Sequence, residues 1–386
     1  MIRIAINAVS VKKISGGVFQ IAPNFILATL KYKVSNVEWL YLVSEDVDKV
    51  IHEEFSDQMG KNYFVFPPQP DFKGTYIKVV QDLKKWEESF KPNIVYSISA
   101  PSYFSFNAPE VMRFTNPWVA TPNKYAYKTL SLFQKIRMML YCLNQKRLLR
   151  KADFFITQTQ AVKDGMLKFL RVPETSIKVV HNVLPIVISS KENSHINSRE
   201  GNFIEIACIA APVPHKNLDI IPKILYLLKE RYGIQNVRFH ITVSDDSPIW
   251  KNIVKQARVL DVMNGIINHG RLPQAELSNL YRKSHLCFLP TLLEVFSVSP
   301  LEAMYYKLPI VATDFAFNRE VLDDAALYYE PMSASSAASQ LANYINDSNL
   351  CDQMRERMMR QLNKFNNYEA HFYSIVDFLI KIACNK

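Results

Sequence analysis

Residues 289–304 have the sequence Leu-Pro-Thr-Leu-Leu-Glu-Val-Phe-Ser-Val-Ser-Pro-Leu-Glu-Ala-Met and follow the short strand-like run 285–289. Residues 299–302 place serine at a helix cap, proline at the first helical position and glutamate at the third. This order is typical of a helix start. The stretch therefore predicts a strand, a loop that carries Glu294, and a helix whose first turn carries Glu302.

A helix that begins at the carboxyl edge of a strand presents unbonded backbone N–H groups and a positive dipole end there. In open α/β sheets, nucleotide phosphates bind at such places. Ser-x-x-Glu is also the ordinary capping box, which by itself explains Glu302. Glu294 has no comparable second explanation. The stretch thus indicates a phosphate site, and a capping role for Glu302 remains open.

The rest of the chain favours two α/β domains. A chain of 386 residues is longer than one hydrophobic core usually fills. Strand-like runs alternate with helical periodicity before and after residues 189–202, a polar stretch typical of a linker. We predict two doubly wound Rossmann-like domains with parallel sheets, residues 1–188 and 203–366, which face an interdomain cleft. A last helix, within residues 367–386, is expected to cross back to the first domain.

Several features favour a cytoplasmic protein. The sequence opens on a strand-like run, without a signal pattern, and no apolar stretch approaches the ~20 residues that span a bilayer. The five cysteines are odd in number, and their spacing fits neither a disulfide framework nor a zinc site.

Most of the net charge of +10 comes from one segment, residues 111–152, which holds nine basic residues and no acidic one. Aromatic residues are interleaved with the charges, and residues 132–149 have helical apolar spacing. This combination favours contact with an anionic membrane surface or an acidic acceptor. A solvated helix that packs on its own sheet is almost as good an explanation. Nucleic acid is not expected, because no motif of nucleic-acid binding accompanies the charge.

The sequence around Glu294 and Glu302 resembles glycosyltransferase family 4, whose members are retaining enzymes of the GT-B fold. The resemblance is strongest between about residues 203 and 332. Besides Glu-x7-Glu it includes His269-Gly-Arg-Leu272, Lys307-Leu-Pro-Ile-Val-Ala-Thr313, Asn318-Arg-Glu-Val321 and Asp324-Ala-Ala-Leu-Tyr-Tyr-Glu-Pro331.

The resemblance implies a nucleoside diphosphate-sugar donor, linked to UDP or GDP, bound by the second domain. Glu302 is then expected to accept from the ribose hydroxyls, and Glu294 to orient the sugar. Main-chain atoms of Arg271 and Leu272 would lie near the base. The diphosphate would be held by Lys216 and by amides of the segment that contains Ser297, Val298, Ser299 and Leu301.

Two further positions match the family less closely. Gly16-Gly17 resembles a glycine loop that meets the donor phosphates, although a glycine pair is otherwise only a turn. Asn116 stands roughly where relatives often place a histidine near the reacting sugar. Lys216 without the resemblance would be an ordinary surface lysine in a turn.

Two other residues depart from the family pattern. Ala211 replaces a phosphate-binding arginine, and Ser297 stands where many relatives have glycine. Phosphate binding is therefore expected to depend more heavily on Lys216 and the helix amides.

The expected reaction is transfer of a hexose, with retention, to a hydroxyl of a lipid-linked or growing polysaccharide glycan. This would place the protein at the cytoplasmic face of a membrane. No metal is expected, because the paired acids of the chain lack Asp-x-Asp spacing and Lys216 can take over the charge-stabilising role. Two alternatives stay open: a non-catalytic sugar-nucleotide-binding subunit, and a GT-B sugar-nucleotide epimerase.

Overall fold

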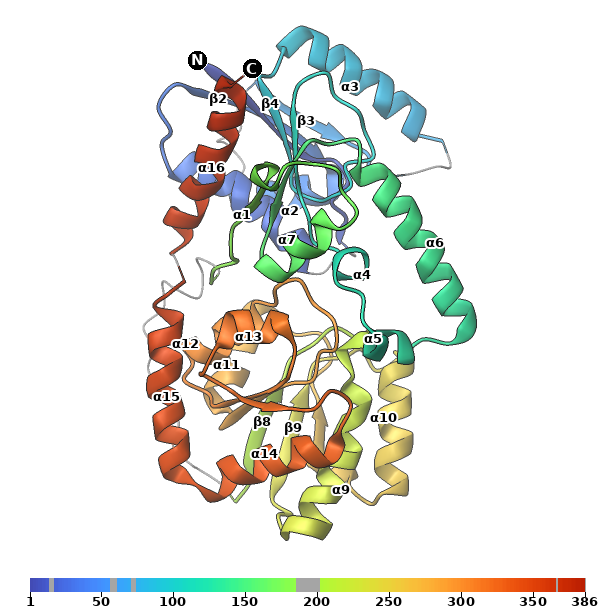
Figure 1. Ribbon diagram of the computed structural model, residues 1–386, viewed down its shortest axis with the longest axis vertical. Coiled ribbons are helices and arrows are strands. Elements are labelled where there is room, and N and C mark those ends of the chain that lie inside the picture. The colour runs from blue at the N-terminus through green and yellow to red at the C-terminus, as the bar shows by residue number, and fades with distance from the viewer. Residues whose placement is uncertain (14–16, 56–60, 71–73, 185–201, 366, 386) are drawn as a thin grey trace. The chain divides into compact units, whose positions relative to one another are not determined.

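A computed structural model describes residues 1–13, 17–55, 61–70, 74–184, 202–365 and 367–385 (Figure 1). Gly16 and residues 189–201 of the predicted linker lie outside the described residues.

The chain divides into two compact units. Unit 1 comprises Met1–Thr121, Arg137–His181 and Asn367–Lys386, and unit 2 comprises Pro122–Ile136 and Asn182–Asn366. Residues 122–136, which the sequence analysis assigned to the first domain, group with unit 2.

The sheet of unit 1 has seven parallel strands in the order β3-β2-β1-β4-β5-β6-β7. The strands are β1 (Ile2–Ala8), β2 (Val37–Ser44), β3 (Tyr63–Phe66), β4 (Ile94–Ser97), β5 (Glu110–Arg113), β6 (Phe154–Thr157) and β7 (Ile177–Val179). The helices are α1 (Gly17–Lys31), α2 (Glu45–Phe55), α3 (Tyr76–Phe90), α4 (Pro117–Ala120), α7 (Gln160–Leu167), η2 (Glu174–Ser176) and α16 (Tyr368–Cys384).

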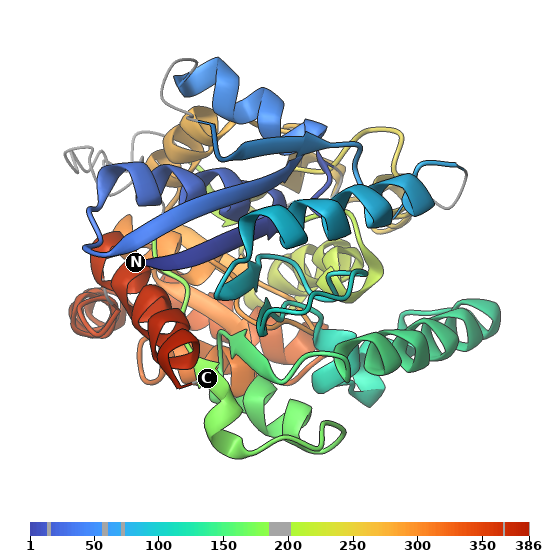
Figure 2. The same ribbon diagram turned by 90° about the horizontal axis from the view of Figure 1, so that it is seen from above.

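Both faces of this sheet are covered, which is why its strands are almost continuously apolar. Helices α1, α2 and α16 pack on one face, and α3 packs on the other, as Figure 2 shows for α1 and α3. Phe372 of α16 is fully buried, and its ring centroid lies 5.4 Å from that of Phe25 in α1. The last helix thus completes a core that begins with Ile4 in β1.

The sheet of unit 2 has six parallel strands in the order β10-β9-β8-β11-β12-β13. They are β8 (Ile204–Cys208), β9 (Val237–Ile241), β10 (Ile266–Asn268), β11 (Leu286–Leu289), β12 (Ile310–Thr313) and β13 (Leu327–Tyr329). The α-helices are α5 (Lys124–Lys128), α9 (Ile221–Tyr232), α10 (Pro248–Val259), α11 (Gln274–Lys283), α12 (Ser299–Tyr305), α13 (Ala316–Leu322), α14 (Ala334–Asn346) and α15 (Ser348–Leu362). Three 3₁₀ turns are η3 (Pro214–Lys216), η4 (Leu218–Ile220) and η5 (Met263–Gly265), and helix α6 (Leu132–Leu149) runs from unit 2 into unit 1.

Local sequence signals explain where these helices begin and end. The Ser247 hydroxyl accepts from the N–H of Trp250 at the start of α10, and Asn367 Oδ1 accepts from Ala370 at the start of α16. Helix α9 ends at Gly233, whose φ of 68° lies in the left-handed region that glycine tolerates best. Caps of this kind satisfy backbone groups that the helix itself leaves unbonded.

The prediction of two doubly wound, parallel-sheet α/β domains is confirmed. Strands β5 and β13 were not predicted. Strand β5 begins with Glu110, a residue unusual in a buried strand, and the carboxylate is accommodated because the hydroxyl of Ser97 donates to it. Strand β13 has only three residues.

Candidate active site

Two of the predicted site residues, Lys216 and Glu294, lie at the topological switch point of the unit 2 sheet. From β8 the chain builds β9 and β10 on one side, then returns to form β11, β12 and β13 on the other. Loops that leave neighbouring strands in opposite directions open a crevice at the carboxyl edge, where ligands of doubly wound sheets bind. Lys216 follows β8, and Glu294 follows β11.

Lys216 and Glu294 form an ion pair. The Nζ atom of Lys216 lies 2.5 Å from Oε2 of Glu294, and the exposed fractions of the two side chains are 14% and 21%. The other carboxylate oxygen, Oε1, accepts from the N–H of Val295 at 3.2 Å. The two residues are 78 positions apart, so the fold alone brings them together.

Electrostatics keep this pair charged. Burial raises the pKa of Glu294, but the positive charge and hydrogen bond of Lys216 outweigh it, and the resulting pKa is below its ordinary value. Burial, with the adjacent charge of Lys216, lowers the pKa of His215 to about 4. His215 is therefore neutral at physiological pH, which leaves Lys216 as the cation beside Glu294.

Backbone contacts hold the two loops in place. The N–H of Leu292 donates to the carbonyl of His215 at 2.8 Å, which joins the loop after β11 to the loop after β8. The side-chain amide of Asn123 donates to the carbonyl of Leu292 at 2.8 Å. The Thr313 hydroxyl at the end of β12 donates to the carbonyl of Thr291 at 2.6 Å. Glu294 thus extends from a loop that is fixed on three sides.

Glu302 is held by a tyrosine of a different helix. It lies in the first turn of α12, is 8% exposed, and its Oε2 accepts from the Tyr281 hydroxyl of α11 at 3.0 Å. The Tyr281 ring stacks on that of Tyr306 with a centroid distance of 5.4 Å. Glu302 is therefore an acceptor in a fixed position.

The predicted cap of α12 is wrong by one position. The cap residue is Val298, whose carbonyl accepts from the N–H of Glu302 at 3.0 Å, so Ser299 is the first helical residue. The reason lies in Ser297, whose hydroxyl accepts from the N–H of Ser299 at 3.3 Å. Glu302 consequently stands at the fourth helical position and is not the partner of Ser299 in a capping box.

The remaining predicted donor residues of unit 2 lie at the start of α12 and after β10. Ser297, Val298 and Ser299 are half-buried, whereas the Leu301 side chain is fully buried and only its backbone can serve a ligand. Arg271 is exposed and Leu272 is half-buried, just after β10 and after Gly270, whose φ is 67°.

Asn116 belongs to unit 1, where its side chain has two structural contacts. Oδ1 accepts from the N–H of Trp118 at 3.1 Å and caps α4, and Nδ2 donates to the Tyr141 hydroxyl at 3.3 Å. Gly17, the other predicted residue of this unit, is the first residue of α1.

Asn116 also lines a cavity of about 400 Å³ in unit 1. This cavity lies at the switch point of the unit 1 sheet, between residues that follow β1 and residues that follow β4. Apart from one alanine, its walls are polar, aromatic and proline residues: Ser10, Lys12, Gln69, Pro70, Ser99, Ala100, Pro101, Tyr103, Thr115, Asn116, Pro117, Trp118, Tyr141 and Gln145.

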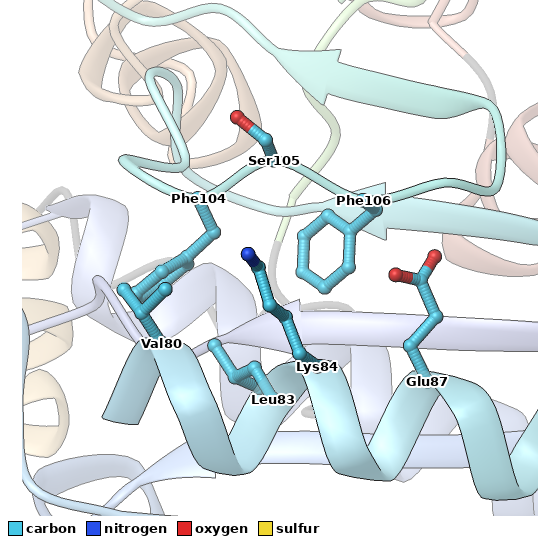
Figure 3. A pocket seen from close by; sticks show the side chains of 7 residues that line it. All are labelled: Val80, Leu83, Lys84, Glu87, Phe104, Ser105 and Phe106. Carbon is cyan, nitrogen blue, oxygen red and sulfur yellow. The ribbon is translucent and has the colours of Figure 1, made fainter. Parts of the chain in front are cut away.

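A second hollow in unit 1 has a structural role. Figure 3 shows it between α3 and residues 104–106, and its volume of about 10 Å³ suits a single water. Beside it, Glu87 Oε1 accepts from the N–H of Asn107 at 2.7 Å and of Ala108 at 2.9 Å. The carboxylate thus secures the loop.

Within the described residues, no three His, Cys, Asp or Glu side chains are grouped so that they could hold a metal ion. No helix in that part of the chain is long and apolar enough to cross a membrane.

Comparison with known proteins identifies the fold. Residues 189–361 match the family model described as glycosyl transferases group 1. The chain superimposes on a glycosyltransferase from Rickettsia africae with a TM-score of 0.72 at 14% identity, covering 100% of this chain and 99% of that one. It superimposes equally well, at 15% identity, on HepE of Anabaena in complex with UDP and glucose, covering 99% and 100%. The chain has the GT-B fold.

A curated relative extends the comparison to sequence. The chain is 24% identical over 227 residues to the O-antigen chain mannosyltransferase RfbU of Salmonella typhimurium. The match covers 59% of this chain and 58% of that relative's length.

Some contacts of this GT-B protein could not be predicted from its sequence. The contact of Tyr281 with Glu302 is one of these, because nothing in the sequence of α11 indicates which helix this hydroxyl will meet. His215 could have been predicted from its position beside Lys216. The cavity residues Tyr103 and Gln145 are far apart in sequence and form no motif.

Proposed function

We propose that the chain is a retaining, metal-independent glycosyltransferase of family 4 that transfers a hexose from a nucleoside diphosphate-sugar to a hydroxyl acceptor. The observation that carries this proposal is the Lys216–Glu294 pair at the switch point of the unit 2 sheet. A cation there can bind the diphosphate, and a carboxylate beside it can accept from sugar hydroxyls.

Lys216 is suited to bind the diphosphate. An ammonium group has three N–H donors, so it can remain bonded to Glu294 while it donates to phosphate oxygens. Its charge would also stabilise the negative charge that develops on the departing diphosphate. The amides of residues 297–301 would supply further donors. This stabilisation by protein groups is our reason for proposing that no metal is required.

The nucleoside would lie between Glu302 and residues 271–272. A carboxylate has about four acceptor sites, so Glu302 can bind the Tyr281 hydroxyl and still accept from ribose hydroxyls. Tyr281 would act as a positioning residue. The backbone of Arg271 and Leu272 would contact the base, which would be uracil in a UDP-linked donor or guanine in a GDP-linked donor.

Glu294 would orient the sugar for attack on one face. The acceptor oxygen bonds to the anomeric carbon while the bond from that carbon to the phosphate oxygen breaks. The acceptor proton passes to the leaving phosphate oxygen, so no protein base is needed. Attack and departure on the same face retain the configuration.

The acceptor would bind in the cavity of unit 1. Its aromatic rings, amides and hydroxyls suit a saccharide, which presents apolar faces and many hydroxyls. The similarity to RfbU supports an acceptor of the kind used in polysaccharide assembly, either lipid-linked or a growing glycan. We further propose that the protein works at the cytoplasmic face of the cell membrane.

The test is a transfer and hydrolysis assay with a panel of UDP-, GDP- and ADP-sugars, coupled to thermal shifts with each nucleotide. A donor should raise the melting temperature at saturation and release nucleotide slowly in water. Binding without transfer or hydrolysis for every donor would instead indicate a non-catalytic subunit. Conversion of the donor to its epimer would indicate an epimerase.

A further inference from the structure

Helix α6 has an apolar stripe on its outward side. The large apolar residues Leu132, Ile136, Met139, Leu140 and Leu143 are 49% to 75% exposed. They recur at i, i+4, i+7, i+8 and i+11, which places them on one face of a helix. Phe133, next to this stripe, is 75% exposed. Single exposed apolar residues are ordinary, but a continuous stripe of this size marks an interaction surface.

The opposite side of α6 is already occupied. Cys142, Gln145 and Leu149 are its buried residues, and the Gln145 side chain donates to the Tyr103 hydroxyl at 3.3 Å. The apolar stripe is therefore not the face with which α6 packs on unit 1. Figure 2 shows α6 projecting away from the strands of that unit.

Positive charge surrounds the stripe. Lys135 and Arg137 flank Ile136 in the sequence. Arg147, four residues after Leu143, is the next residue along the same face of the helix. No acidic residue occurs between Glu110 and Asp153. Apolar side chains bordered by cations and neutral polar residues, with no acidic residue among them, are complementary to a bilayer surface, in which hydrocarbon lies beneath negative headgroups.

We propose that α6 is a membrane-docking helix, which lies in the interface of an anionic phospholipid bilayer with residues 132–143 inserted. Nucleic acid fits less well, because a phosphate backbone would leave the stripe in water. A second copy of the chain also fits less well, since joining two such helices would bring like charges together.

Docking would also explain how the proposed acceptor reaches its cavity. Tyr141 and Gln145 of α6 line the unit 1 cavity, while Leu140 and Leu143 extend towards the bilayer. One helix would therefore hold the cavity close to the surface in which a lipid-linked saccharide is anchored. This part of the inference rests on the proposed function, whereas docking itself is measured without any substrate.

The experiment is flotation of the full chain with vesicles of phosphatidylcholine alone and of phosphatidylcholine mixed equally with phosphatidylglycerol. We expect binding to the mixed vesicles that weakens in high salt. The double variant Ile136→Asp, Leu140→Asp should bind at least about tenfold more weakly, because two apolar groups no longer enter the bilayer. The matched control is Ile77→Asp, a 72% exposed apolar residue of α3, which should bind like the original chain.

A second variant, Arg137→Gln with Arg147→Gln, separates charge from insertion. Its preference for phosphatidylglycerol should be weaker, because two of the nine basic residues of segment 111–152 are removed, and its fold should be kept, as checked by its melting temperature. The proposal would be overturned if the original chain did not bind the mixed vesicles, or if the double variant Ile136→Asp, Leu140→Asp bound them as well as the original chain does. The proposal would also be overturned if the chain bound no vesicles but self-associated, and the double variant Ile136→Asp, Leu140→Asp abolished that self-association. Binding to heparin without binding to vesicles would overturn it as well. Donor hydrolysis in solution, measured in parallel, should be unchanged in every variant, so a failure of docking is distinguishable from a failure of the proposed chemistry.

Discussion

Lys216 and Glu294, from loops after two adjacent strands of unit 2, form a 2.5 Å ion pair at the switch point of their sheet. Because each side chain is less than a quarter exposed, solvent screens this pair less than a surface pair. The pair therefore links the binding of a charged ligand to the stability of unit 2.

Replacement of Glu294 by Gln should separate binding from transfer. The amide keeps the size of the side chain but cannot accept from sugar hydroxyls as strongly, so we expect kcat to fall by about 100-fold or more. The dissociation constant for the nucleoside diphosphate, measured by calorimetry, should change little. The control is Glu356→Gln on the exposed side of α15. Equal turnover in the Glu294 variant would contradict the assigned role.

Replacement of Lys216 by Met should weaken binding of nucleoside diphosphates far more than binding of the nucleosides. It also leaves Glu294 without its cation, so unit 2 should lose about 1–3 kcal/mol of stability. Calorimetry with UDP, GDP, uridine and guanosine tests the first effect, and urea unfolding tests the second. Lys255→Met, on the exposed side of α10, is the control. Equal losses for nucleoside and diphosphate would show that Lys216 does not contact phosphate.

Replacement of Tyr281 by Phe removes one hydrogen bond from Glu302 and leaves the stacked ring in place. We expect a loss of about 1 kcal/mol in the free energy of unfolding. The KM for the donor should rise while kcat stays close to its original value, because a positioning residue acts on binding. Tyr226→Phe, where the tyrosine is 38% exposed, should change neither quantity. A fall in kcat alone would argue against the ribose role of Glu302.

Acidification should destabilise unit 2 through His215. Burial lowers the pKa of this imidazole from 6.5 to about 4, so between these values the unfolded chain binds a proton that the folded chain does not. Stability therefore falls as pH falls through this window. In His215→Gln the loss between pH ~6.5 and ~4.5 should be smaller by about 1–2 kcal/mol.

Urea unfolding at a series of pH values measures this effect. The control is His52→Gln, since the His52 side chain is 50% exposed. Glu294 also destabilises unit 2 on acidification, but only at lower pH. Its pKa in the folded chain is below the ordinary value, so the carboxylate stays charged through the His215 window. Equal pH dependence in His215→Gln and the original chain would contradict the assignment.

The sequence predicts the architecture well because parallel strands covered on both faces are almost continuously apolar. Residues 2–8 and 286–289 show this directly, whereas β5 is hidden by Glu110, which needs a partner from another strand. Lys216 and Glu294 were both predicted as site residues, but their contact depends on the pairing of β8 with β11. The cap at Val298 depends on the hydroxyl of Ser297, which no capping rule anticipates.

Helix α6 illustrates a different limit. Its apolar residues predict a helix over residues 132–149, and the structure has α6 over the same residues. Apolar side chains occur on both of its sides, however, so the sequence alone cannot say which side is covered. Only the contacts of Cys142, Gln145 and Leu149 resolve this.

The position of α16 affects how the chain is made. Phe372, Ile375 and Leu379 pack into the same core as Ile4 and Tyr96, although the ribosome adds them more than two hundred residues later. Unit 1 thus cannot complete its core while unit 2 is being synthesised, because the part of its sheet that α16 will cover is still exposed. A purified chain truncated after residue 366 should therefore hold a protease-resistant unit 2 and a protease-sensitive unit 1.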